Sequence, residues 1–239
     1  MSSASEKIIL ALDVETFEEA ENFVKTLSPT IGIFKVGKQL FTRCGPKIIV
    51  SVHDHKGKVF FDLKYHDIPN TVARAVVEAV MLKVFMLTIH AMGGMEMMQE
   101  AVASSISSAR TMSAPPPLIV AVTILTSLKQ EDLGAIGIDL PIEEAVSRLA
   151  VLAKQAGVNG VVASAQEAQR IKAACGNDFI IVTPGIRPAD TSLDDQKRVV
   201  TPKEALRAGS TFMVIGRPIP VSYTHLTLPT TLCMCRSRW

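Results

Sequence analysis

The chain has 239 residues, which is long enough for one barrel-sized domain or two small ones. Apolar residues make up 48% of the sequence, a share that excludes a disordered chain and allows a large buried core. The formal net charge is only +2 and no block of Lys or Arg stands out, so no nucleic-acid surface is expected. These properties favour a small-molecule ligand, whose anionic groups need only a few well-placed cations.

The sequence carries no sign of a membrane or secretory destination. No segment has the roughly 18 consecutive apolar residues of a transmembrane helix, and the first residues lack the pattern of a signal peptide. Cys44 and Cys175 are isolated and are expected to be buried thiols, while Cys233 and Cys235 lie in an unusual C-terminal segment. A reducing cytoplasm fits this cysteine usage, and no membrane partner is expected.

Short β-branched runs alternate with amphipathic segments along the chain. They predict eight strands, at 8–14, 33–36, 59–64, 86–91, 118–124, 160–164, 179–183 and 212–216. Such alternation favours parallel βαβ units, and eight of them in one domain predict an α/β fold of the (β/α)8 TIM-barrel type. A doubly wound open sheet is the structural alternative.

Three of the expected helices carry recognisable end signals. Thr16 and Glu19 form a possible capping box, Pro69 suits a first helical turn, and Gly157 suits a helix end. The three expected apolar faces comprise Phe17, Ala20, Phe23, Val24 and Leu27; Val72, Val76 and Val80; and Val146, Leu149, Ala150, Ala153 and Ala156.

Charged residues occupy the ends of the first three predicted strands. In the third strand, alternation puts Asp62 and Lys64 on one face with Phe60, pointing into the mouth of the barrel. The same counting directs Asp13 and Lys35 toward that space, where barrel enzymes place their chemistry. The alternative is an internal salt-bridge network without a catalytic role. Because desolvation offsets the Coulomb gain of buried ion pairs, four ionisable groups at strand ends favour a functional site.

Two Gly/Pro motifs follow the seventh and eighth predicted strands, where such barrels usually bind phosphate: TPGIRP (183–188) and IGRP (215–218). Gly216 allows close backbone approach, and Arg217 offers a bidentate fork to phosphate. Each motif alone is as easily an ordinary turn, but the pair favours a phosphate site. The polar segment 187–199 is long enough to be a closing lid.

Six motifs in chain order resemble those of bacterial orotidine 5′-phosphate decarboxylases, and the resemblance runs from about residue 7 to residue 219. The motifs are LALD (10–13), FKVG (34–37), DLKYHDIPNT (62–71), LTS (125–127), TPGIRP (183–188) and IGRP (215–218). The resemblance implies a metal-free, cofactor-independent conversion of orotidine 5′-phosphate to UMP, the last step of de novo pyrimidine synthesis, in a homodimer.

The resemblance also implies the roles of the charged residues. Lys64 resembles the proton donor to C6 of the pyrimidine, and Lys35, Asp62 and Asp67 resemble the rest of the charged array. Asp62 is expected near the substrate carboxylate. Asp67 and Thr71 are expected to reach into the site of the partner subunit.

The remaining substrate contacts follow from the same resemblance. Asp13 and Lys35 would hold the ribose hydroxyls, and Thr126 resembles a contact to the pyrimidine. His66 and His90 lie in similar surroundings and are expected to be structural. The expected phosphate grip and its lid comprise Arg187, Gln196, Gly216 and Arg217.

The sequence departs from this family after residue 219. The family continues with a final helix that closes the barrel, whereas Pro220 and Pro229 oppose a helix and no apolar stripe of helical period is present. We expect a barrel at 1–219 followed by an atypical, foreign or read-through segment at 220–239. Because the final helix would cover apolar surface, its lack predicts an aggregation-prone or poorly active protein.

Two rival functions share these residues. A related Mg²⁺-dependent sugar-phosphate decarboxylase or synthase would use Asp62, Lys64 and Asp67 but require a metal. An inactive truncated barrel would bind nucleotide without turning it over.

Overall fold

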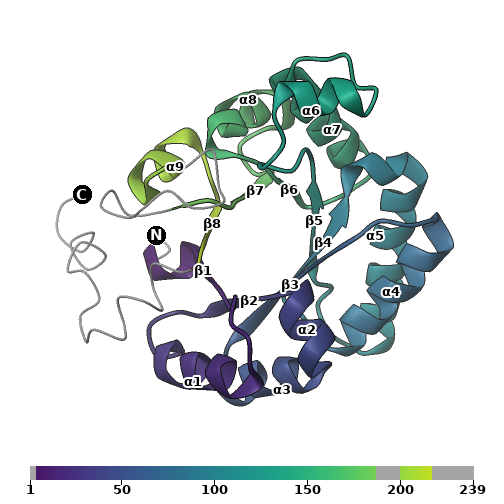
Figure 1. Cartoon of the computed structure of the whole chain (residues 1–239). Helices are drawn as coiled ribbons and strands as arrows, with labels where there is room; N and C mark the ends of the chain where they lie inside the picture. The colour runs from purple at the N-terminus through teal and green to yellow at the C-terminus, as the bar shows by residue number, and fades with distance from the viewer. Residues whose placement is uncertain (1–3, 187–199, 217–239) are drawn as a thin grey trace.

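The computed structural model describes residues 4–186 and 200–216, and they form a closed barrel of eight parallel strands in sequence order (Figure 1). The eighth strand pairs with the first, with Ile9 opposite Val214, so the sheet has no open edge. The (β/α)8 prediction is confirmed, and the doubly wound alternative is excluded. Figure 1 shows the helices arranged around the outside of the ring of strands.

All eight predicted strands are present. They are β1 Ile8–Ala11, β2 Ile33–Gly37, β3 Lys58–Tyr65, β4 Met86–His90, β5 Leu118–Val122, β6 Gly160–Val162, β7 Ile180–Thr183 and β8 Phe212–Ile215. The sequence placed the ends of β1, β5 and β6 two or three residues too far along the chain. These residues leave the ladder because they turn into the loops at the mouth of the barrel, and Ser164 instead caps the following helix.

Helices separate most neighbouring strands. The α-helices are α1 Phe17–Leu27, α2 Lys38–Cys44, α3 Lys47–Asp54, α4 Pro69–Met81, α5 Gly94–Thr111, α6 Gln130–Ala135, α7 Ile142–Gln155, α8 Ala165–Cys175 and α9 Pro202–Ala208. Two 3-10 turns complete the described elements, η1 Ala4–Lys7 and η2 Ala91–Gly93.

The predicted helix signals are confirmed. The Thr16 hydroxyl accepts the backbone N–H of Glu19, whose carboxylate accepts the N–H of Thr16, so the capping box starts α1. Pro69 lies in the first turn of α4, and Gly157 follows α7 with a φ of 85° that suits glycine. Side chains from all three expected faces are buried against the strands, among them Val24, Val76 and Ala150.

The strands separate two apolar layers. Outward-facing side chains pack against the helices in the larger layer, which includes the T-shaped ring pair of Phe61 and Phe41. Inward-facing side chains fill the barrel, and the buried apolar ones are Ile9, Ile33, Phe60, Met86, Val120 and Val182. This inner layer matters for function because it closes the barrel beneath the strands' carboxyl ends.

Two sequence predictions fall outside the described residues: the lid at 187–199 and the atypical segment at 220–239. The domain boundary at residue 219 and the lack of a final helix therefore stay predictions. Among the described helices, none is both long and apolar enough to span a membrane.

Candidate active site

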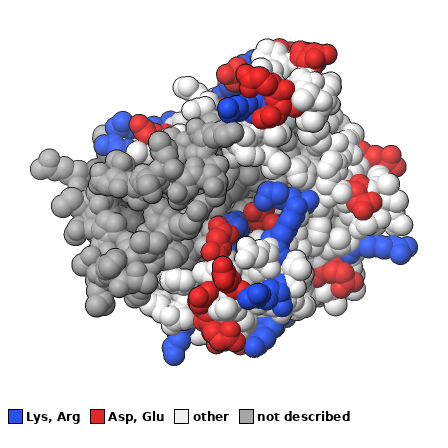
Figure 2. Space-filling view, in the orientation of Figure 1, with Lys and Arg blue, Asp and Glu red and all other residues white. Residues whose placement is uncertain are grey.

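Four charged side chains meet at the carboxyl ends of β1, β2 and β3. The Lys35 ammonium lies 3.0 Å from Asp13 Oδ1 and 3.9 Å from Asp62 Oδ2. Lys64 Nζ donates to both carboxylate oxygens of Asp62, each at 2.8 Å. The array thus runs Asp13, Lys35, Asp62, Lys64 with alternating sign. Figure 2 shows acidic and basic side chains next to one another near the centre of the visible face.

The interior of this array is largely withdrawn from water. The side chains of Lys35 and Asp62 keep 12% and 13% of their exposure, Lys64 keeps 27%, and Asp13 keeps 55%. Asp62 therefore lies between two ammonium groups in a region of low dielectric, where their interactions are stronger than in water. The sequence prediction that these four residues converge is confirmed.

The backbone at Lys64 is unusual. Lys64 has a φ of +54°, in the left-handed region that costs a non-glycine residue roughly 1–2 kcal/mol. The β3–β4 ladder is irregular here, since Phe61 pairs with Leu87 and Tyr65 next pairs with Ile89. Strain of this kind persists where the surroundings hold it, typically at functional sites. Simple alternation thus predicted the correct face for Lys64 but not its backbone conformation.

A buried threonine on β4 contacts the array from behind. The Thr88 hydroxyl accepts the backbone N–H of Lys64 at 2.8 Å and donates to Asp62 Oδ1 at 3.1 Å. Thr88 was not among the site residues predicted from the sequence. The available signal was a hydroxyl in the apolar strand Met86–His90, on the same inward face as Met86.

The charged array lines one side of a cavity of about 290 Å³. Its floor is apolar and includes Phe60 and Val182 of the inner layer together with Val162 and Val214. The cavity is of the size that binds a small organic ligand, with polar groups on one side to fix the ligand's orientation.

The ends of β7 and β8 also line the cavity, and β8 lies next to β1. Pro184, Gly185 and Ile186 lie there, and so does Gly216. Gly185 has a φ of 76°, a backbone conformation that favours glycine. Among the residues that the structure describes, a Cβ on Gly216 would meet Asp13 Oδ2 at 3.5 Å and the Ala11 Cβ at 3.6 Å, both ordinary contact distances that leave room for a side chain. The advantage of glycine at 216 is therefore the space it leaves in the cavity itself.

The loop after β5 contributes Leu125 and Thr126 to the cavity wall. Farther along, the Gln130 side chain at the start of α6 bonds to the backbone at the start of α7. Its amide nitrogen donates to the Leu140 carbonyl and its amide oxygen accepts the Ile142 N–H, both at 2.9 Å. These two bonds join the start of α6 to the start of α7 and so limit the movement of the loop.

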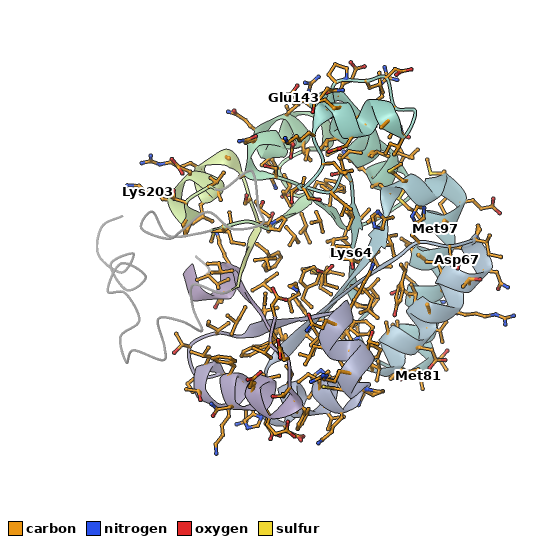
Figure 3. The ribbon with its side chains drawn as sticks, viewed as in Figure 1. Lys64, Asp67, Met81, Met97, Glu143 and Lys203 are labelled. Atoms are coloured by element: carbon orange, nitrogen blue, oxygen red, sulfur yellow. The ribbon has the colours of Figure 1, made fainter. Side chains whose placement is uncertain are left out.

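Asp67 and Thr71 do not line the cavity of their own chain. Both are exposed, and the Asp67 carboxylate accepts the backbone N–H of Ile68 at 2.7 Å. Figure 3 shows Asp67 farther from the barrel axis than Lys64. Ile68 beside it is a large apolar side chain with 66% exposure. The structure therefore separates these two predicted site residues from the array of the same chain.

A second cavity of about 350 Å³ adjoins the first. It shares Asp13, Lys35, Asp62 and Lys64 with the first cavity and extends over the start of α2, including Lys38. The charged array is therefore accessible from two sides.

His66 and His90 stack beside the array, with ring centroids 5.1 Å apart. Burial, followed by the nearby charge of His66, lowers the pKa of His90 to about 4. Lys38 and Lys64 lower it further, and Asp62 opposes them. His90 is thus neutral at neutral pH, and neither ring lines the cavity.

Three predicted phosphate contacts, Arg187, Gln196 and Arg217, lie outside the described residues. Within residues 4–186 and 200–216, no group of three or more His, Cys, Asp or Glu side chains is arranged to hold a metal ion.

Comparison with known proteins places this site in a family. The sequence profile described as "Orotidine 5′-phosphate decarboxylase / HUMPS family" matches residues 6–224. The orotidine 5′-phosphate decarboxylase of Syntrophotalea carbinolica is 53% identical over 219 residues, covering 92% of this chain and 90% of that protein. The one from Pelobacter propionicus is also 53% identical, over 216 residues that cover 90% of this chain and 89% of that protein.

A solved structure is similar over nearly the same span. The crystal structure of orotidine 5′-phosphate decarboxylase from Lactobacillus acidophilus has a TM-score of 0.79 at 34% sequence identity, covering 96% of each chain. The sequence profile, the curated relatives and this structure agree with the motifs and with the barrel. The chain belongs to the orotidine 5′-phosphate decarboxylase / HUMPS family.

Proposed function

We propose that this protein decarboxylates orotidine 5′-phosphate to UMP, the last step of de novo pyrimidine synthesis, with no cofactor. The observation that carries the proposal is the alternating array of Asp13, Lys35, Asp62 and Lys64 over an apolar cavity. Relatives about half identical over nine tenths of the chain carry the name of this enzyme.

The difficult step is the loss of CO₂ from C6 of the pyrimidine. The bond between C6 and the carboxylate carbon breaks, and its electron pair stays at C6. The ammonium of Lys64, already held by Asp62 at 2.8 Å, stabilises this developing charge without having to reorient. Lys64 then transfers a proton to C6, which gives UMP, and the resulting amine takes a proton from solvent.

The rest of the cavity is suited to hold the nucleotide. Asp13 and Lys35 are placed to bind the ribose hydroxyls, while Thr126 contacts the pyrimidine over the apolar floor. The loops after β7 and β8 would accept the phosphate, at Gly216 together with Arg187, Gln196 and Arg217. Binding energy from this remote phosphate would organise the reacting end of the site.

The proposed enzyme is a homodimer in which Asp67 and Thr71 complete the site of the partner. Their exposed positions outside their own cavity, the exposed Ile68 and the second opening onto the array support this arrangement. A reducing cytoplasm is the proposed location, since Cys44 and Cys175 are free thiols.

The test is ultraviolet-monitored decarboxylation of orotidine 5′-phosphate by the purified chain with EDTA present. Turnover that survives EDTA supports the proposal and separates it from an Mg²⁺-dependent sugar-phosphate enzyme. The same assay on the Syntrophotalea carbinolica relative provides the positive control. UMP binding without turnover under conditions where the control is active would instead assign this chain to the nucleotide-binding, inactive class.

A further inference from the structure

We propose that Thr88 is a positioning residue for the reaction, holding the Lys64 backbone and the Asp62 carboxylate in the arrangement that directs the Lys64 ammonium. This inference rests on the proposed function, because Lys64 and Asp62 are taken there as the reacting array. Thr88 itself does not line the cavity, so it acts through its two partners.

The direction of both hydrogen bonds at Thr88 follows from the chemistry of the partners. A backbone N–H only donates, so the Thr88 oxygen must accept from Lys64. The Asp62 carboxylate only accepts, so the single hydroxyl proton must point at Asp62 Oδ1. Thr88 has no exposed surface, so these bonds form away from competing water.

The irregular ladder explains why Lys64 needs a side-chain acceptor. From Phe61 to Tyr65, β3 advances four residues while β4 advances two, from Leu87 to Ile89. This mismatch shifts the strand pairing at Lys64, where the φ of +54° also departs from strand geometry. The Thr88 hydroxyl accepts the N–H of Lys64 at this point and satisfies a partly buried donor that is costly to leave without a partner.

The same hydroxyl closes a ring of contacts. Starting from the Lys64 N–H, the ring passes through Thr88 Oγ1 to Asp62 Oδ1 and returns through the Lys64 ammonium at 2.8 Å. One atom thus ties the main chain of Lys64 to the carboxylate that orients its side chain. Removal of the hydroxyl would take away the contact that ties the carboxylate to β4 and would leave the strained backbone of Lys64 without this acceptor.

The first experiment compares Thr88→Val with Thr88→Ser. Valine keeps the shape but loses the hydroxyl, so we expect kcat to fall about 10- to 100-fold with little change in KM, as for a displaced reacting group. Serine keeps the hydroxyl and should restore most of kcat. Thr88→Ala paired with Thr88→Ser provides the same comparison at smaller volume if the valine variant does not fold.

The matched control is Thr211→Val at the opposite end of the barrel. The Thr211 hydroxyl also accepts a backbone N–H from a neighbouring strand, that of Ile181 at 3.1 Å. Its loss should lower the melting temperature as Thr88→Val does, but leave kcat unchanged. Equal kcat for wild type and Thr88→Val, or an equal loss of kcat in Thr211→Val, would overturn the positioning role.

A second readout does not depend on activity. Amide hydrogen exchange at Lys64, followed by NMR, should be slow in the wild type and in Thr88→Ser but fast in Thr88→Val. If the wild type shows no turnover, the proposed function fails, and this exchange pattern still decides whether Thr88 holds Lys64. Unchanged exchange at Lys64 in Thr88→Val would reject the inference whatever the assay shows.

Discussion

Lys64 is held at both ends, with its backbone N–H on Thr88 and its ammonium on Asp62. This double restraint predicts that the side chain is already aimed before substrate binds, so its removal should affect the chemical step. We expect Lys64→Ala to lower turnover about 1,000-fold or more, because both charge stabilisation and proton transfer are lost. UMP binding, measured by titration calorimetry, should remain detectable.

Lys58→Ala is the control for Lys64→Ala. Lys58 begins the same strand at the other end of the barrel, where its ammonium lies 4.9 Å from the centroid of the Phe85 ring. Its loss should leave turnover near the wild-type value. Wild-type turnover in Lys64→Ala would remove Lys64 from the mechanism.

His90 predicts a specific dependence of stability on pH. Because its pKa is lowered from 6.5 to about 4, the unfolded chain binds a proton more readily than the folded chain between these values. The stability due to neutral His90 is therefore complete above pH 6.5 and is lost as pH falls toward 4. Solvent screening reduces the contribution of His90 to the free energy of unfolding, since the ring is only half-buried.

Thermal melts across this pH range test the His90 effect. The melting temperature of His90→Gln should fall less than that of wild type between pH 6.5 and about 4. Since burial is the largest cause of the lowered pKa, His66→Gln should keep most of the wild-type slope. Parallel curves for wild type and His90→Gln would contradict the shift.

The positions of the array residues and of Thr88 could be predicted from the sequence to different extents. Asp13, Lys35 and Asp62 were predictable because side chains alternate along a strand and the carboxyl ends of barrel strands meet. Thr88 was not, because its role depends on the lateral register of β3 against β4, which local sequence does not specify. The positive φ of Lys64 likewise arises from that irregular pairing.

At the scale of elements, strand existence was more predictable than strand ends. Apolar β-branched runs determined all eight strands, but at Leu12 and Thr123 the chain is still apolar or β-branched after the ladder has ended. Single backbone bonds continue there, from the Leu12 N–H to Lys35 O and from the Thr123 N–H to Val162 O. The ladder ends where the neighbouring strand ends. The length of the neighbouring strand is a property of the tertiary structure, which the local sequence does not specify. Capping boxes, by contrast, are local, and the one that starts α1 was read from sequence.

The segment between β5 and α7, which contains α6, is held in place by the Gln130 side chain. Since Gln130 joins the starts of α6 and α7, Gln130→Ala should loosen the loop that presents Thr126. We expect KM for the nucleotide to rise about 3- to 10-fold with kcat nearly unchanged, because a contact made equally to bound substrate and transition state is weakened. Steady-state kinetics measure both constants.

The exposed Gln155 at the end of α7 provides the control for Gln130. Gln155→Ala should keep both kinetic constants at wild-type values. A fall in kcat with unchanged KM in Gln130→Ala would mean that the loop acts on the chemical step.

At the scale of the whole molecule, the closed barrel brings together residues that are far apart in sequence. Gly216 follows β8 and Asp13 follows β1, yet a Cβ at 216 would lie 3.5 Å from Asp13 Oδ2 because β8 pairs with β1. Asp67 is the exception among the predicted catalytic residues in the described part of the chain, since it lies outside the cavity that holds the others. In the proposed dimer, a subunit would receive Asp67 from its partner, and the dimer would then be part of the mechanism.

This arrangement predicts complementation between two inactive variants. In a hybrid dimer of Lys64→Ala with Asp67→Ala, the site built on the Asp67→Ala subunit has an intact Lys64 and receives Asp67 from its partner. The other site lacks both groups. The hybrid, purified through a different affinity tag on each subunit, should therefore show about half the wild-type turnover per dimer, as two-fold symmetry requires. Each variant alone should be nearly inactive.

The converse hybrid distinguishes this arrangement from one in which Asp67 serves its own site. When wild type is paired with the double variant Lys64→Ala/Asp67→Ala, the wild-type subunit keeps Lys64 but its partner offers no Asp67. This hybrid should be nearly inactive if Asp67 acts across the interface. It should keep about half the wild-type turnover if Asp67 acts within its own subunit, and the first hybrid should then be silent. Each hybrid contains one intact and one substituted copy of Lys64 and of Asp67. The hybrids differ only in how these copies are distributed between the two subunits, so a difference in turnover reports whether Asp67 acts within its own subunit or across the interface.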